Sequence, residues 1–135
     1  MKENTSINLK ESIVLAQEVV KILLEKKALD VKLYDVREDA TITDYYIVAT
    51  GRSLTHVASL SDDLAERLSS NGVEAARIEG KRGAPWILVD YLDVIVHIFD
   101  RESRDFYNFE RLLKAESLVD ISELIAEIDK KFNII

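Results

Sequence analysis

The residues that could perform catalytic chemistry are few in this 135-residue chain. Asp90 and Asp93 flank a predicted hairpin turn, and the segment Gly51–Ser53 lies between a predicted strand and a predicted helix. Backbone amides at such a turn can bind phosphate, and paired carboxylates can hold Mg²⁺, as nucleotidyl transfer would require. A spacing of three residues, however, does not place both aspartates on one face of a strand. A helix N-cap and turn-forming aspartates explain the same residues more simply.

Side chains suited to other catalytic or metal sites do not cluster in the sequence. The chain has two histidines, His56 in the first turn of a predicted helix and His97 within a predicted strand, and it has no cysteine. A lone histidine in a strand is more often a hydrogen-bonded structural residue than a ligand or a base. The lack of cysteine excludes disulfides, thiol nucleophiles and zinc–thiolate sites. We therefore expect no catalytic residue, no metal ion and no cofactor.

Composition and charge indicate a cytoplasmic protein with a basic partner. Hydrophobic residues make up 47% of the chain and charged residues 32%, which excludes disordered and low-complexity classes. No apolar run approaches the roughly 20 residues that cross a bilayer. The N-terminus also lacks the apolar centre of a signal peptide. We therefore predict no membrane association. The net charge of −7 fits a basic protein as partner better than bare RNA or DNA, so we also predict no specific nucleic-acid binding.

The apolar spacing predicts the order helix, two strands, helix, three strands and two helices. The predicted helices are 6–27, 53–71, 101–114 and 120–132, and the predicted strands are 29–36, 45–50, 73–78, 86–91 and 93–99. Two early and two late helices can cover one sheet. We therefore predict one domain over residues 1–135, an α/β (α+β) sandwich with a five-stranded mixed sheet flanked by helices. Its core is expected at about 6–116 and a C-terminal helical extension at about 117–135.

Trp86 is the only tryptophan, and it follows a Gly-Ala-Pro loop at the start of a predicted strand. Alternation along that strand places Leu88 and Asp90 on the same face as Trp86. Two interpretations stay open. In the first, Trp86 covers the edge of the sheet as part of the core. In the second, Trp86 and Leu88 are apolar anchors of an exposed interface with acidic residues around them, the pattern typical of binding hot spots.

Several segments, taken in their order along the chain, carry a family resemblance. They are Thr43–Ser53, Glu79-Gly80, Trp86–Tyr91, Asp93–Phe99 and Arg104–Glu110. Together they resemble the ribosomal silencing factor family, also called the Iojap-related family, over about Leu29 to Glu116. Two positions depart from the family pattern: Leu92 stands where glycine is usual, and Leu113 where tryptophan is common.

The resemblance implies a non-enzymatic factor that binds the large ribosomal subunit through large-subunit ribosomal protein fourteen. That ribosomal protein lies at the subunit interface, so a factor bound to it would block joining of the small subunit and repress translation under starvation. The resemblance also implies a nucleotidyltransferase-like topology without the catalytic carboxylates, and it is compatible with a homodimer. The residues expected at the ribosomal-protein contact are Trp86, Leu88, Asp90, Glu79, Gly80 and Tyr91. The alternative is a nucleotide-binding or nucleotidyltransferase-like enzyme that uses Asp90 and Asp93.

Overall fold

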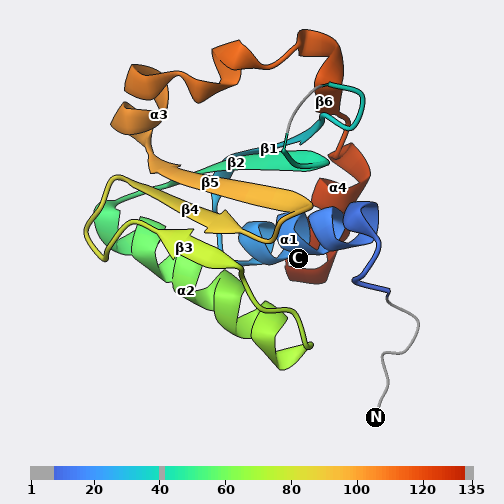
Figure 1. Ribbon diagram of the computed structural model, residues 1–135. Helices are drawn as coiled ribbons and strands as arrows, with labels where there is room; N and C mark the ends of the chain where they lie inside the picture. Colours follow the sequence, from blue (N-terminus) through green and yellow to red (C-terminus); the bar gives the residue numbers. More distant parts are fainter. Residues whose placement is uncertain (1–7, 40–41, 133–135) are drawn as a thin grey trace.

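The centre of the molecule, a computed structural model that describes residues 8–39 and 42–132, is a mixed six-stranded sheet (Figure 1). The strands are β1 Leu29–Asp35, β2 Tyr45–Gly51, β3 Arg77–Glu79, β4 Trp86–Asp90, β5 Val94–Asp100 and β6 Leu118–Val119. Their order across the sheet is β3-β4-β5-β2-β1-β6. β2 and β5 run parallel, whereas the other neighbouring strands are antiparallel. A mixed sheet with flanking helices confirms the predicted fold class.

The sixth strand corrects the prediction of five strands. β6 has only two residues, and it pairs with β1 through the partners Leu33↔Val119 and Tyr34↔Leu118. A strand this short cannot show the alternation that reveals longer strands. Its existence therefore depends on the tertiary contact with β1 and not on a local pattern.

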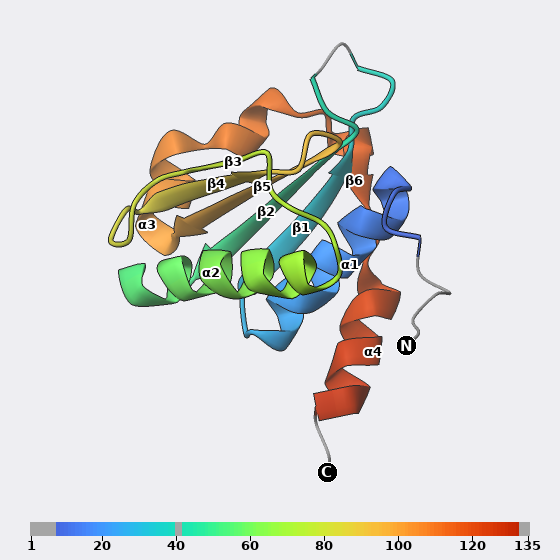
Figure 2. The same ribbon diagram turned by 60° about the horizontal axis from the view of Figure 1, so that its bottom comes forward.

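Helices lie on both faces of the sheet (Figure 2). Helices α1 (Ser12–Glu25) and α2 (Leu54–Ser70) pack on one face, which we call the inner face. The opposite face, the outer face, carries α3 (Arg101–Tyr107) and the 3-10 turns Phe109–Leu112 and Ala115–Ser117. The last helix, α4 (Ser122–Phe132), packs against α1.

The main core lies between the inner face and the helices α1 and α2. Val19 and Leu23 of α1 and Leu64 of α2 are fully buried, and they belong to one cluster with Ile47 and Ile98 of the central strands. Buried positions recur every three or four residues along both helices, as their apolar spacing predicts. Each such side chain stabilises the fold by about 1.5–3 kcal/mol. This core gives the outer face a rigid support.

Helix α2 begins and ends where local signals predict. The Ser53 hydroxyl accepts a hydrogen bond from the backbone N–H of His56 at 3.1 Å and so caps the first turn. Gly72, which follows the C-cap residue Asn71, has a φ of +86°, a conformation that glycine adopts at low cost. For this helix, capping chemistry alone was sufficient to predict both ends.

The first helix and the third strand are shorter than predicted. Residues 1–7 lie outside the described residues, and α1 begins at Ser12. The Asn8 side chain accepts a hydrogen bond from the Lys10 N–H at 3.1 Å, so it forms a local turn before the helix and does not cap the first turn of α1. In the predicted strand 73–78, Val73 and Ala75 contact the core, and the register of β3 with β4 begins at Arg77.

The predicted helix 101–114 is interrupted. Asn108 has a φ of +47°, which ends α3 and redirects the chain into a 3-10 turn. The apolar residues of this segment are therefore divided between the sheet and the solvent. Phe109 and Leu113 pack on the outer face, whereas Phe106 is 78% exposed and Leu112 is 66% exposed. Asparagine tolerates the left-handed conformation, but its presence does not by itself predict a break.

The C-terminal helix α4 packs on the rest of the chain. Ile121 and Ile128 are buried, and Lys21 of α1 forms an ion pair with Glu127 at 3.2 Å. Phe132, at the end of the helix, is 46% exposed. In residues 8–39 and 42–132, none of the helices is long and apolar enough to cross a membrane.

We expect the substitution Leu92→Gly to stabilise the protein. Leu92 lies in the turn between β4 and β5 with a φ of +74°, and it is 65% exposed. The left-handed conformation costs a non-glycine residue roughly 1–2 kcal/mol, and an exposed leucine gains little packing in return. The melting temperature should rise by about 3 °C, the shift that corresponds to roughly 1 kcal/mol in a domain of this size.

The matched control for this prediction is Leu92→Ala, which keeps the backbone strain. Its melting temperature should stay close to that of the wild type. A clear fall in the melting temperature of Leu92→Gly would contradict the strain argument and would show that the Leu92 side chain contributes packing.

Candidate binding surface on the outer face

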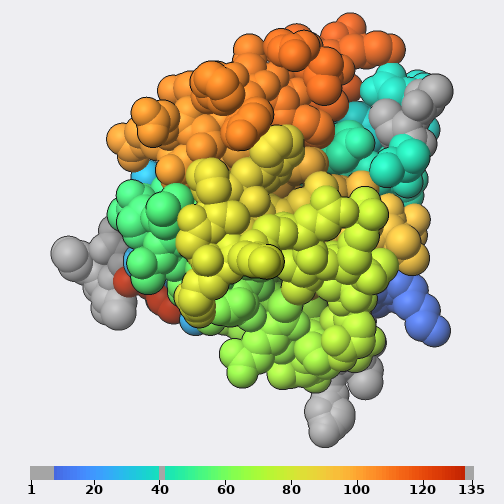
Figure 3. All heavy atoms as spheres, turned by 60° about the vertical axis from the view of Figure 1, so that its left-hand side comes forward, coloured from blue at the N-terminus to red at the C-terminus, as the bar shows by residue number. Residues whose placement is uncertain are grey.

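A group of aromatic side chains covers the outer face where β4 and β5 meet α3. Figure 3 shows the α3 segment in orange lying directly above the yellow region that contains the start of β4. We call this group the outer aromatic cluster, and its members are Tyr46, Trp86, His97, Phe99, Tyr107 and Phe109. Because it combines rings from three strands and from α3, the cluster joins α3 to the sheet.

Trp86 is half-buried in this cluster. Its ring stacks on Phe99 with 4.8 Å between centroids and an angle of 29° between the planes. Tyr107 of α3 lies 4.9 Å from the same ring. Trp86 therefore packs within the molecule and is also partly accessible to solvent, and its role as an interface anchor stays a prediction.

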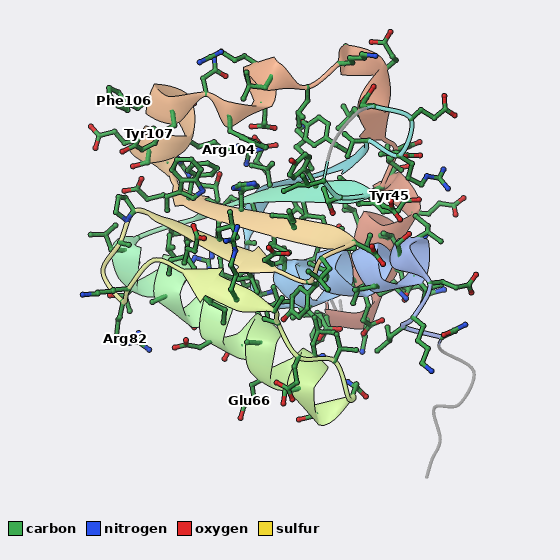
Figure 4. All side chains as sticks on the ribbon, in the orientation of Figure 1. Tyr45, Glu66, Arg82, Arg104, Phe106 and Tyr107 are labelled. Carbon is green, nitrogen blue, oxygen red and sulfur yellow. The ribbon has the colours of Figure 1, made fainter. Side chains whose placement is uncertain are left out.

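The accessible apolar surface continues from Trp86 in two directions. Along β4 it reaches Leu88, which is also half-buried on the outer face. Towards α3 it reaches Tyr107, 46% exposed, and Phe106, 78% exposed, whose rings meet edge to face at 5.1 Å. Figure 4 shows Phe106 and Tyr107 side by side at the end of α3. Contiguous exposed aromatic surface of this kind is typical of protein-binding sites.

Charged groups border this surface on the side of strand β3. Glu79 lies opposite Leu88 in the pairing of β3 with β4, and its carboxylate is 3.1 Å from the Arg77 guanidinium. Both side chains are more than half exposed, so this pair is solvated and weak. Breaking the ion pair with Arg77 would therefore cost little free energy, and the Glu79 carboxylate is available to a basic side chain of a partner.

Gly80 allows the close approach of β3 to the start of β4. It has a φ of +108°, and a Cβ at this position would stand 2.8 Å from the carbonyl oxygen of Trp86. A larger residue would push the two strands apart beside Trp86. The backbone of Gly80 therefore shapes the surface.

Asp90 and Tyr91, also predicted at the contact, are buried in this structure. The Asp90 carboxylate accepts a hydrogen bond from the Leu92 N–H at 2.7 Å and lies 3.3 Å from the Arg77 guanidinium. Tyr91 is 6% exposed, and burial raises its pKa to about 12. Within the described residues its hydroxyl is the one buried side-chain group without a hydrogen-bond partner. Both residues position the end of β4.

Most of the groups considered for nucleotide chemistry have structural roles. The Arg52 N–H donates to His56 Nδ1 at 2.9 Å, and Ser53 caps α2. A Cβ on Gly51 would stand 2.8 Å from the Val57 side chain, so this glycine permits close packing of α2 on β2. Asp90 is held by the β4–β5 turn, whereas Asp93 is exposed. Among the described residues, no group of three or more histidines or carboxylates could hold a metal ion.

Arg104 ties α3 to the sheet beside the aromatic cluster, and it is 8% exposed. Its guanidinium forms two hydrogen bonds with the Glu110 carboxylate, at 2.8 and 3.0 Å, and another with the Thr50 hydroxyl at 2.9 Å. It also donates to the carbonyl of Asp30 at 2.6 Å. Asp30, at a bulge in β1 with a φ of +47°, turns this carbonyl towards Arg104. Figure 4 shows Arg104 between α3 and the sheet.

Glu110 completes this network. Burial alone would raise the pKa of Glu110, but hydrogen bonds from Arg104 and from the Tyr34 hydroxyl outweigh it and keep the pKa below its ordinary value. The carboxylate is therefore ionised at neutral pH. Burial and the hydrogen bond to Glu110 raise the pKa of Tyr34. Its hydroxyl therefore stays protonated and donates a hydrogen bond to the Glu110 carboxylate. Sequence reasoning missed this network and also the contact of Tyr107 with Trp86, because neither has a local signature.

The chain is similar to a protein family and to several known proteins. The family described as "Ribosomal silencing factor during starvation" matches residues 9–133. Ribosomal silencing factor RsfS of Haemophilus influenzae is 40% identical over 86 residues, which are 64% of this chain and 84% of that protein. A mouse protein named Mitochondrial assembly of ribosomal large subunit protein 1 is 26% identical over 113 residues, which are 81% of this chain and 50% of that protein.

A solved structure shows the same fold. A crystal structure of a protein from Chromobacterium violaceum superposes with a TM-score of 0.72 at 30% identity, covering 76% of this chain and 85% of that one. The family match extends from before α1 to the end of α4, and so it includes β4 and the whole outer aromatic cluster. This chain belongs to the ribosomal silencing factor family.

Proposed function

We propose that this protein binds the large ribosomal subunit through large-subunit ribosomal protein fourteen and thereby blocks joining of the small subunit. It would act in the cytoplasm by steric exclusion, without catalysis, and would lower translation when nutrients are limiting. The single observation that carries the proposal is the partly accessible Trp86, which joins Leu88 and the exposed Tyr107 in one apolar surface. Family membership and the name of the mouse relative support a ribosomal partner.

The chemistry of the surface fits a basic protein. Its centre is apolar and aromatic, whereas Glu79 at its border is solvated and exposed. The chain has a net charge of −7, so its overall field attracts a positively charged partner and repels free nucleic acid. In this proposal Trp86 and Leu88 contact the ribosomal protein, Glu79 meets its basic side chains, and Gly80, Asp90 and Tyr91 hold the strand ends in place.

The test is sedimentation of ribosomal particles in sucrose gradients with and without the purified protein. The protein should co-sediment with large subunits in the absence of nucleotide. It should also reduce the fraction of joined ribosomes when small subunits are added. Failure to co-sediment with large subunits would overturn the proposal. Mg²⁺-dependent nucleotide turnover that Asp93→Ala eliminates would favour the enzyme alternative. Sedimentation velocity of the protein alone would show whether it forms the homodimer that the resemblance allows.

Glu79→Ala should weaken binding modestly. Because Glu79 is exposed and already paired with Arg77, its loss should lower affinity for large subunits only about twofold to fivefold. The difference between Glu79→Ala and the wild type should shrink as salt is raised, since exposed charges are screened. The matched control is Glu66→Ala, because Glu66 is an exposed carboxylate on α2 and lies away from the proposed binding surface. A loss as large as that expected for Trp86→Ala would contradict the assignment of Glu79 to the border.

A further inference from the structure

Within the described residues, the Trp86 side chain makes one hydrogen bond, and its partner is His97. The Trp86 indole N–H donates to His97 Nδ1 with 3.0 Å between the nitrogens. An indole N–H can only donate, so Nδ1 must be the acceptor. The remaining ring proton of a neutral His97 is therefore on Nε2.

Burial keeps the His97 ring neutral. His97 is 4% exposed, and burial lowers its pKa to about 4. The ring is also held sterically, since Phe109 lies 4.2 Å and Tyr46 lies 5.7 Å from it between centroids. At neutral pH His97 Nδ1 is thus available as an acceptor for the Trp86 indole. The neighbouring rings of Tyr46 and Phe109 limit the other orientations of the His97 ring.

We infer that His97 is the positioning residue of the proposed ribosomal-protein contact: its Nδ1 holds the indole of Trp86 in the orientation that a partner recognises. This inference rests on the proposed function, and it adds a chemical requirement for the partner. Because the indole N–H is already used inside the chain, the partner meets carbon atoms of the ring. A side chain that offers aliphatic carbon, including the stem of a lysine or an arginine, fits this surface better than a hydrogen-bond acceptor.

Two substitutions of similar size distinguish a role of His97 as a hydrogen-bond acceptor from a role in packing alone. His97→Leu fills the site but offers no acceptor, whereas His97→Asn offers a side-chain oxygen close to the position of Nδ1. Because Trp86 is the only tryptophan, the indole emission of the folded protein reports on this residue alone. Binding to large subunits is measured alongside the emission wavelength and the quenching by acrylamide, after circular dichroism has shown that each variant is folded.

We expect His97→Leu to bind large subunits about tenfold more weakly, with emission shifted to longer wavelength and increased quenching, as the loss of one partly buried hydrogen bond predicts. His97→Asn should restore binding to within about threefold of the wild type. A folded His97→Leu variant with wild-type emission and wild-type binding would overturn the inference, and so would failure of His97→Asn to restore either readout.

A measurement on the wild-type protein needs no variant. The single indole N–H gives one resolved signal in a ¹⁵N NMR spectrum, and its exchange with solvent should be slowed at least tenfold relative to a free indole. Exchange at the free rate would overturn the inference even if no His97 variant folds. If the wild type does not bind large subunits, the proposed function fails, whereas the exchange rate still decides whether His97 holds Trp86.

Discussion

Trp86→Ala should lose binding to the large ribosomal subunit by roughly 30- to 1000-fold, the range expected for truncation of a central aromatic anchor. The substitution removes the accessible ring and also the surface against which Tyr107 packs at 4.9 Å. The partner would therefore lose both its main apolar contact and the ordered edge beside it. Co-sedimentation with large subunits and inhibition of subunit joining should disappear together at protein concentrations that saturate the wild type.

The matched control is Leu118→Ala, which truncates a 46% exposed apolar residue in β6, at the opposite edge of the sheet. This variant should bind like the wild type. Circular dichroism must show that Trp86→Ala is folded, because its ring also stacks on Phe99. Wild-type binding by a folded Trp86→Ala variant would mean that the ring acts only in packing and that the interface lies elsewhere.

Arg104→Ala should lower the free energy of unfolding by about 3 kcal/mol, the lower end of the cost of breaking a buried ion pair, because the Glu110 carboxylate that remains is only partly buried. Glu110 would keep its negative charge in a partly buried site, and the Thr50 hydroxyl and the carbonyl of Asp30 would lose a donor. The free energy of unfolding, measured by urea denaturation, checks the prediction. Binding should weaken as well, because Arg104 holds α3 and α3 carries Tyr107.

Arg101→Ala is the control for this prediction, since Arg101 is an exposed arginine at the start of the same helix. Its free energy of unfolding should change by less than about 0.5 kcal/mol. The double variant Arg104→Met with Glu110→Gln should recover part of the loss, because it removes the unpaired charge. Equal destabilisation by Arg101→Ala and Arg104→Ala would contradict the importance of the buried network.

The parts of the fold that could be predicted are those governed by local chemistry. Helix α2 follows from its apolar spacing and from its caps at Ser53 and Gly72, and the β4–β5 hairpin follows from two apolar runs with a short turn. The parts that were missed depend on distant partners. β6 exists because β1 offers it an edge, and the break at Asn108 serves to bring Phe109 back onto the sheet.

The candidate site divides in the same way. The period of two along a strand correctly placed Trp86 and Leu88 on one face. It could not show that Tyr107 reaches Trp86, because that contact depends on how α3 is held over the sheet. It also could not pair Arg104 with the carbonyl of Asp30, 74 residues earlier, since this contact needs the bulge in β1. Periodicity predicts which face a residue occupies, and tertiary packing decides its neighbours.

The two edges of the sheet are short. The long apolar strands β5 and β2 lie in the interior of the sheet, and the strands at its edges are β3 with three residues and β6 with two. Short edges offer few unpaired backbone groups to another chain, and the charged side chains of Arg77 and Glu79 further disfavour pairing along β3. The short edges and the charges on β3 therefore disfavour self-association through strand pairing, although the rings of Phe106 and Tyr107 are exposed on α3.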